Sequence, residues 1–421
     1  MIKLLHVTLC VALISCTVVA SEYSYKNYLS GNWGGEREHL HNLGVDLKLN
    51  YTTEPASSIS GGYQNNYTYL HNIGAEFDAD LEKLLGIKKT TFLAKFSSRS
   101  GQNVSEEYVV PASAQQGRYV YGEYFNKSQE IYGGQKTKMV NFQVTTQLTK
   151  STSFDVGRLV MNDFFLRSDL YCDFMSNSTC GAPKGVFTPY ALDAYPDATM
   201  GAHAAINITP IVDLHVGIFD GGWTKQQPYG FDWGLGKNGT AFSVEAQLFL
   251  QRGSVYGTQK VLKFGATHHS GEFDNYKSGK STKGNSSYYI LADIGLYSED
   301  SEKNQGLSIF GSYIYNPNEE ISALNHFFNL GFVYRGLINS RSRDKLGLNY
   351  VFSKHSKYNT YTHNYISGQV RSDESIIELS YNFVLPYGIN IMPDMQYIHH
   401  PNGSSDFSDV TVLGAKFSVN F

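Results

Sequence analysis

Beyond residue 44, stretches of about ten residues alternate between apolar and polar side chains and then give way to turn residues. In VDLKLNYT, the apolar side chains of Val45, Leu47 and Leu49 lie on one face of an extended chain, and the polar side chains between them lie on the other. The same alternation recurs in AFSVEAQLF, DKLGLNYVF and SIIELSYNF, and in TVLGAKFSVNF, which ends at Phe421. This period of two predicts β-strands with one apolar and one polar face.

The alternating segments predict roughly sixteen strands. Their expected starts are at about residues 45, 69, 90, 138, 152, 200, 212, 240, 260, 287, 306, 326, 344, 375, 388 and 411. The gaps after odd-numbered strands are long, on the order of twenty residues, whereas those after even-numbered strands are short. TPI at 209–211 and LPYG at 385–388 are among the shortest. This sorting is typical of a transmembrane β-barrel, which has short turns on one side of the membrane and long loops on the other.

We therefore expect an all-β fold, a transmembrane antiparallel β-barrel of about sixteen strands with a short N-terminal helix. About ten tilted residues cross a bilayer, and a sheet in lipid must close on itself so that every backbone group is paired. A barrel of this size leaves an aqueous channel. The alternative, a soluble all-β protein, explains the alternation but neither the sorted gaps nor Phe421, which resembles the C-terminal assembly signal of bacterial barrels.

The first twenty residues read as a secretion signal. Lys3 is followed by an apolar run, and VVA before Ser21 supplies the small residues that signal peptidase requires. LISC, which ends at Cys16, resembles a lipoprotein cleavage site and leaves that alternative open. We expect three parts: a signal peptide at 1–20, an N-terminal segment with a short helix at 21–44, and the barrel at 45–421.

Composition agrees with this picture. The 421 residues are 41% hydrophobic and 14% aromatic, and the abundance of Tyr and Phe favours strands. The formal net charge of -4 gives no sign of a nucleic-acid partner. Cys172 and Cys180 lie in YCDFMSNSTC, and because an exported chain meets an oxidising compartment we expect a disulfide. A zinc site is the weaker alternative, since no histidines cluster with the pair, and no cofactor is expected.

GNWGGEREHL, at 31–40, fits the pattern G-x-W-G-G-x-R-x-x-L and is followed by the first strand. Four further blocks follow: FDVGRLVMNDFF, YPDATMGAHAAINITPIVDLHVGIFDG, SRSRDKLGLNYVFSKHS and ESIIELSYNFVLPYGINIMPDMQYIHHPNG. Together, in this order, they resemble the carbohydrate-selective porins of the OprB type. The resemblance implies a passive channel for mono- and oligosaccharides in the Gram-negative outer membrane, in contact with its lipid and often a trimer. His399, His400 and the cysteine pair depart from the family pattern and leave the sugar open.

A porin selects solutes by the width and polar lining of its narrowest point. The gap at about 161–200 is one of the two longest and is the best candidate for a loop that folds into the channel. Its charged residues lie among aromatic ones, a mixture that suits sugars, whose hydroxyls bond to charged groups and whose C–H faces lie on rings. The candidate constriction residues are Arg37, Arg158, Asp163, Arg167, Asp169 and Asp173.

We expect Arg167 and Asp169 to face the constriction, with Arg158 nearby. The alternative is that the loop charges pair with one another in solvent. Strict alternation places Arg158 on the lipid side, so either a bulge near Gly157 turns it inward or it lies above the bilayer core.

Arg37 belongs to the expected helix, which Ser30 or Asn32 can cap and Gly44 can end in the left-handed conformation. Its side chain either points to the lumen or pairs with Glu36 or a wall carboxylate. Weaker contributions to ion preference are expected from charged residues of the wall, namely Glu76, Asp78, Glu245, Lys263, Asp293 and Arg335.

The predicted function is passive, carbohydrate-preferring diffusion of small sugars through a channel that inward-folded loops narrow. The alternative is a general diffusion porin for small hydrophilic solutes. No enzyme is expected, because the chain has neither G-x-S-x-G nor H-E-x-x-H. The doublets His268–His269 and His399–His400 are not expected to form two-ligand sites, since neighbours in a strand point to opposite faces.

Overall fold

A computed structural model describes the fold. The described residues are 25–110, 125–131, 136–181, 183, 185, 195–221, 229–231, 233, 239–300, 304–358, 371–405 and 407–421. The predicted signal at 1–20, including Cys16, lies outside them. No helix in this part of the chain is long and apolar enough to cross a membrane.

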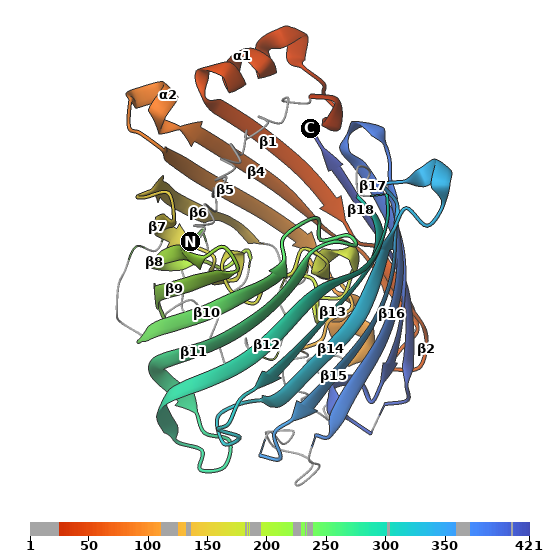
Figure 1. The fold of residues 1–421 in the computed structure, drawn as a ribbon. Helices are drawn as coiled ribbons and strands as arrows, with labels where there is room; N and C mark the ends of the chain where they lie inside the picture. Colours follow the sequence, from red (N-terminus) through yellow and green to blue (C-terminus); the bar gives the residue numbers. More distant parts are fainter. Residues whose placement is uncertain are drawn as a thin grey trace, which may run out of the picture.

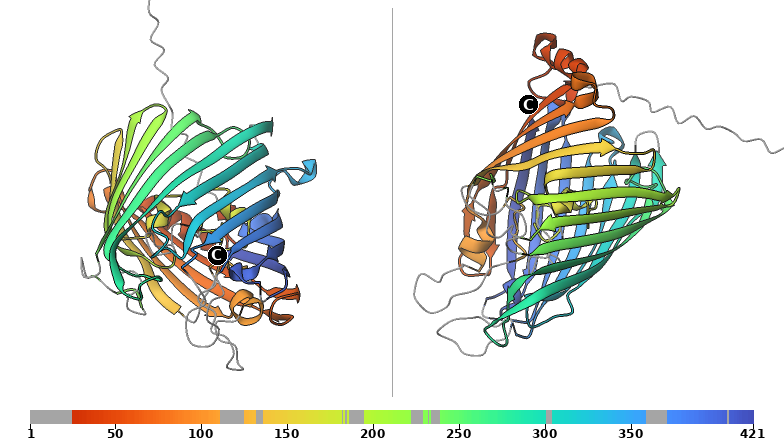
Figure 2. Two further views of the ribbon diagram at one scale, coloured as in Figure 1. Left: turned by 90° about the horizontal axis from the view of Figure 1, so that it is seen from below. Right: turned by 90° about the vertical axis from the view of Figure 1, so that its left-hand side faces the viewer.

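The described residues form one closed antiparallel sheet, in which β1 pairs with both β4 and β18 (Figure 1). The strands are β1 (Val45–Thr53), β2 (Ala56–Ser60), β3 (Asn66–Thr68), β4 (Leu70–Asp80), β5 (Thr90–Gly101), β6 (Lys136–Gln147), β7 (Thr152–Leu159), β8 (Thr199–Thr209), β9 (Val212–Asp220), β10 (Thr240–Gln251), β11 (Lys260–Asp274), β12 (Ser281–Asp300), β13 (Gln305–Tyr315), β14 (Leu324–Arg335), β15 (Lys345–His355), β16 (Asp373–Val384), β17 (Ile389–His399) and β18 (Val410–Asn420). Figure 2 shows how the tilted strands surround the lumen.

Two of the eighteen strands in this sheet, β2 and β3, extend the first hairpin, so the closed barrel has sixteen strands, as predicted. β1 and β2 pair with successive parts of β18, at Tyr51 with Val419 and at Ser57 with Leu413. Pro55 separates them because it has no N–H to donate, but its carbonyl still accepts from the Ala415 amide at 3.0 Å.

The predicted strand starts agree with the observed ones to within two residues except at β12, which begins at Ser281 instead of about 287. Its first residues are polar and lack the alternation of a membrane strand. They nevertheless pair with β11, with Lys283 opposite Glu272 and Thr282 opposite Phe273. The long hairpin therefore continues past the apolar part of the wall.

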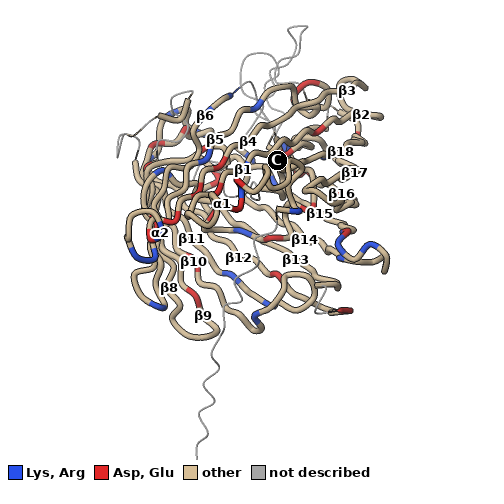
Figure 3. Tube along the Cα trace, turned by 90° about the horizontal axis from the view of Figure 1, so that it is seen from above, with Lys and Arg blue, Asp and Glu red and all other residues tan. Residues whose placement is uncertain are grey.

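The alternation sorts side chains between the two faces of the wall. In β10, Phe242 and Val244 are 49% and 43% exposed on the outer face, whereas Ser243 and Glu245, between them, are 5% and 0% exposed. Figure 3 looks onto the barrel from the end that carries α1 and shows acidic and basic residues gathered along β1, β4 and β5. The outer surface is thus apolar and the lumen is polar, as the sequence predicted.

The short helix α1 (Glu36–Leu43) and the C-terminus lie at the same end of the barrel as α2 (Leu81–Leu85) (Figure 1). Gly44 ends α1 in the left-handed conformation, as expected, with φ 97°. Asn32, one of the two expected caps, occupies the N-cap position of the 3-10 turn η2 (Trp33–Gly35), whereas Gly35 occupies the N-cap position of α1 itself and Ser30 occupies neither. Asn32 still accepts a hydrogen bond from the Glu38 amide, at 3.1 Å.

Candidate functional site

Residues 161–181, which we call the inner belt, leave the end of β7 and lie against the inward faces of the opposite strands. At its start the Leu166 amide donates to Glu245 Oε2 of β10, at 2.8 Å, and Ser168 Oγ donates to Asp293 Oδ1 of β12, at 2.7 Å. Lys263 Nζ of β11 donates to the Arg167 carbonyl, at 2.5 Å. Three of the predicted wall residues therefore hold the belt.

The second half of the belt is held by β15 and β16. Lys345 Nζ lies 2.6 Å from Asp173 Oδ1, and Ser380 Oγ donates to the Asp173 carbonyl at 2.6 Å. The Met175 and Ser176 amides both donate to Glu378 Oε1, at 2.8 and 2.7 Å. Burial raises the pKa of Asp173, while the adjacent lysine opposes that shift. Asp173 thus attaches the belt to the wall.

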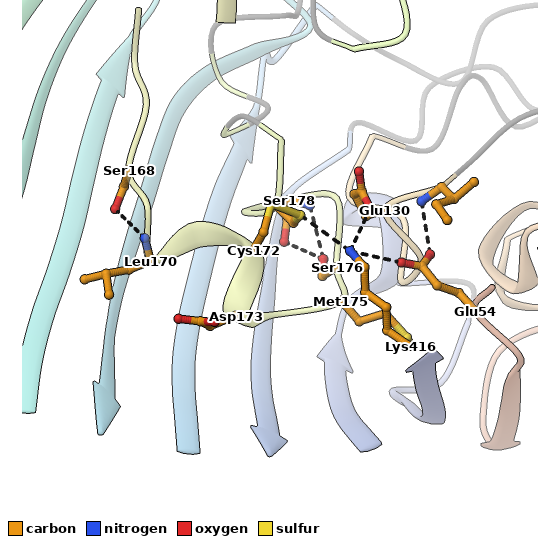
Figure 4. The surroundings of a disulfide bond; sticks show 12 residues. Glu54, Glu130, Ser168, Leu170, Cys172, Asp173, Met175, Ser176, Ser178 and Lys416 are labelled. Atoms are coloured by element: carbon orange, nitrogen blue, oxygen red, sulfur yellow. Dashed lines mark hydrogen bonds and ion pairs between the residues drawn. A yellow bond between two sulfur atoms is a disulfide. The ribbon is translucent and has the colours of Figure 1, made fainter. Parts of the chain in front are cut away.

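Cys172 and Cys180 form the predicted disulfide, with their Cα atoms 4.3 Å apart. Figure 4 shows the bridge beside Lys416 of β18, whose Nζ lies 2.8 Å from Glu130 and 3.5 Å from Glu54. The disulfide therefore closes a short loop of the belt at the place where the belt contacts the ion pairs of Lys416.

In the connection between β5 and β6, the described residues 102–110 and 125–131 also enter the lumen, which the sequence did not reveal. Lys127 pairs with Glu106 at 2.7 Å, and its amide donates to Asn177 Oδ1 of the belt, also at 2.7 Å. The Ile131 amide donates to the buried carboxylate of Glu54, at 3.0 Å. The only signal for this arrangement was the length of the gap, which together with the gap that contains the belt is one of the two longest between predicted strands.

A cavity of about 270 Å³ lies between these loops and the wall formed by the first strands. It is lined by Asn50, Thr52, Asn72, Gly74, Ala75, Glu76, Lys95, Phe96, Arg99, Glu130, Ile131, Tyr195 and Lys416. Its charges are largely paired, since Glu76 binds Lys48 at 2.6 Å and Lys95 at 3.0 Å. Polar groups of both signs therefore surround this space.

Tyr195 contributes an aromatic ring to the cavity. The Arg99 guanidinium lies over this ring, 4.9 Å from its centroid, in a cation–π contact. Arg99 is 4% exposed, and its Nε has no hydrogen-bond partner in the described part of the chain. The ring and the guanidinium together offer the pairing of apolar face and hydrogen-bond donor that suits a sugar.

The structure places four of the six candidate constriction residues in the belt. Arg167 and Asp169 pair with each other at 3.2 Å, and their side chains are 59% and 61% exposed. Asp163 Oδ2 accepts from Asn141 Nδ2 at 3.4 Å, and the protein atoms that replace water around it raise its pKa. Asp173 is engaged with the wall, so its carboxylate is 4% exposed.

Arg158 lies in β7, directly before the belt, and Arg37 lies in α1. Arg158 pairs in register with Phe142, which is exposed on the outer face, and its Nε donates to the Met139 carbonyl at 3.3 Å. Gly157 before it has φ 129°, but Gly157 and Arg158 keep an unbroken register with both β6 and β8, so the bulge suggested by the alternation is not observed.

Arg37 packs between the rings of Tyr28 and Trp33, 3.8 and 4.1 Å from their centroids, and donates to Ser30 Oγ. It is 2% exposed. Among the described residues, neither of the two expected arrangements is observed, orientation toward the lumen or pairing with Glu36 or a wall carboxylate, because the two aromatic rings bury the guanidinium within the N-terminal segment.

Comparisons with known proteins give one consistent answer. A family model described as "Carbohydrate-selective porin, OprB family" matches residues 64–421. Porin B of Pseudomonas aeruginosa is 24% identical over 444 residues, which cover 94% of this chain and 91% of that protein. GNWGGEREHL precedes the residues that the family model matches, so the family evidence rests on the barrel itself.

Solved structures show the same fold. The high-pH structure of Pseudomonas putida OprB has a TM-score of 0.82 and 21% identity, over 95% of this chain and 99% of that one. The low-pH structure has a TM-score of 0.61 and 17% identity, over 95% of this chain and 100% of that one.

Proposed function

Because the chain belongs to the OprB family of carbohydrate-selective porins, we propose that it carries small sugars by passive diffusion through a channel that the inner belt narrows. The protein is a β-barrel of the Gram-negative outer membrane. The family and fold indicate a channel, not an enzyme. Mono- and oligosaccharides are the proposed solutes, and a homotrimer is the proposed assembly, which native mass spectrometry checks.

One observation carries this proposal. The belt is hydrogen-bonded to the inner wall from β10 to β16, and the space left beside β1, β4 and β5 is lined by paired charges, amides and two aromatic residues, Phe96 and Tyr195. Such a lining exchanges hydrogen bonds with hydroxyl groups without attracting one sign of ion strongly. It therefore suits neutral, hydroxyl-rich solutes.

Planar-bilayer recordings with added sugars test the proposal. We expect ion conductance through the purified protein and its reversible blockade by sugars at millimolar concentration. Conductance that sugars leave unchanged would favour the alternative, a general diffusion porin. A preparation that forms no channels would contradict both.

We also propose that Arg167 and Asp169 contact passing sugars. Their exposed charged groups pair with each other, and a solvent-exposed pair of this kind is worth less than about 1 kcal/mol, so solutes can compete for them. We expect the double replacement Arg167→Ala and Asp169→Ala to lower sugar uptake into liposomes several-fold while the unfolding temperature of the barrel stays the same. Unchanged uptake would remove both residues from the solute path.

A further inference from the structure

Asp155, His203 and His215 form a chain of hydrogen bonds across the inward faces of β7, β8 and β9. Asp155 Oδ2 lies 2.9 Å from His203 Nδ1, and His203 Nε2 lies 3.0 Å from His215 Nδ1. Thr145 Oγ1 of β6 donates to the second oxygen of Asp155, at 2.5 Å. His203 is 3% exposed, so its two nitrogens depend on these partners.

The start of the inner belt packs against His203 of this hydrogen-bonded chain. The Phe164 ring stacks on the His203 ring, with centroids 4.1 Å apart and planes 22° apart. Phe165 meets His203 edge-on at 5.6 Å. Beyond this contact, the Leu166 amide donates to Glu245 of β10.

The geometry limits how many protons the Asp155–His203–His215 chain can bind. With both rings neutral, His203 donates from Nδ1 to Asp155 and accepts at Nε2 from His215 Nδ1. One added proton is accommodated, because His203 can then donate at both nitrogens while His215 accepts at Nδ1. A second added proton places two N–H groups against each other across 3.0 Å. That hydrogen bond is then lost, and two like charges face each other.

The surrounding charges are fixed by other contacts. His215 faces Asp213 of its own strand, Glu245 of β10 and Lys263 of β11. Asp213 is bound to Arg252 at 2.8 Å, and Glu245 accepts from the Tyr289 hydroxyl at 2.7 Å. On the belt side, the groups over His203 are the uncharged rings of Phe164 and Phe165.

We propose that the Asp155–His203–His215 chain positions the start of the inner belt and makes the channel respond to acid, because binding of the second proton separates the two imidazoles beneath Phe164. This inference rests on the proposed channel function. When both protons bind, the net charge of these three side chains changes from one negative to one positive. The lumen therefore becomes more favourable to anions as the pH falls.

Reversal potentials across a salt gradient provide the test. We expect the wild-type channel to shift toward anions as the pH is lowered from about 7.5 to about 5. His215→Gln can still donate to His203 but binds no proton, so we expect it to lose at least half of this shift. His268→Gln, which changes an exposed histidine paired with Ser286 Oγ at 2.9 Å, is the matched control and should behave as wild type. A His215→Gln channel that titrates like wild type overturns the inference.

Nitrogen NMR of the histidine side chains in detergent micelles gives a readout that needs no conduction. We expect the His203 and His215 resonances to report one shared hydrogen bond near neutral pH and its loss in acid. If the two rings titrate independently of each other, the inference fails even when the channel conducts. A wild-type protein that shows the shared bond but no conductance contradicts the proposed function and leaves the proton-binding chain established.

Discussion

Replacement of Tyr195 by Ala is expected to weaken sugar blockade of the channel by about two- to tenfold. The Tyr195 ring lines the cavity and carries Arg99 on one face. An aromatic contact of this kind is worth about 0.5–1.5 kcal/mol, and about 1.4 kcal/mol corresponds to tenfold in affinity. The measurement is the sugar concentration that halves the single-channel current in a planar bilayer.

Tyr195→Phe is the matched control, because it keeps the ring and the cation–π contact and removes only the hydroxyl. We expect its sugar affinity to stay close to that of the wild type. Equal blockade in Tyr195→Ala and wild type would show that solutes do not pass along this ring, and would move the solute path to another part of the lumen.

The second large effect is expected from Glu378→Leu. One oxygen of Glu378 accepts from two belt amides, those of Met175 and Ser176. Leucine leaves both buried N–H groups without a partner, and each such loss costs about 1–3 kcal/mol. We expect the belt to detach here, so that single-channel conductance rises and fluctuates between levels, as recorded in planar bilayers.

Glu378→Gln separates loss of the acceptor from loss of the charge. Its amide oxygen can still accept from both backbone N–H groups, so we expect steady conductance near the wild-type level. Heat-modified migration in gel electrophoresis should show that both variants form barrels. If Glu378→Leu conducts steadily at the wild-type level, the belt does not depend on this anchor.

The candidate site was predictable in part. A long gap with two cysteines in an exported chain pointed to a bridged loop inside the channel, and Cys172 and Cys180 do form that bridge. Asp173 was assigned to the solute path, but Lys345 holds it against the wall. Tyr195 and Arg99 were not singled out, because neither their spacing nor their neighbours in the sequence distinguish them from other aromatic and basic residues.

The sequence by itself determined the wall. A period of two, about ten residues long and repeated with alternating long and short gaps, specifies paired strands with one apolar face, and such a sheet is stable in lipid only when closed. Only the tertiary structure decided what the lumen contains. Leu166 meets Glu245, and Ser176 meets Glu378, across separations of 79 and 202 residues. These pairings form only when the barrel closes, because closure decides which strands face the belt. The local sequence pattern does not contain that information.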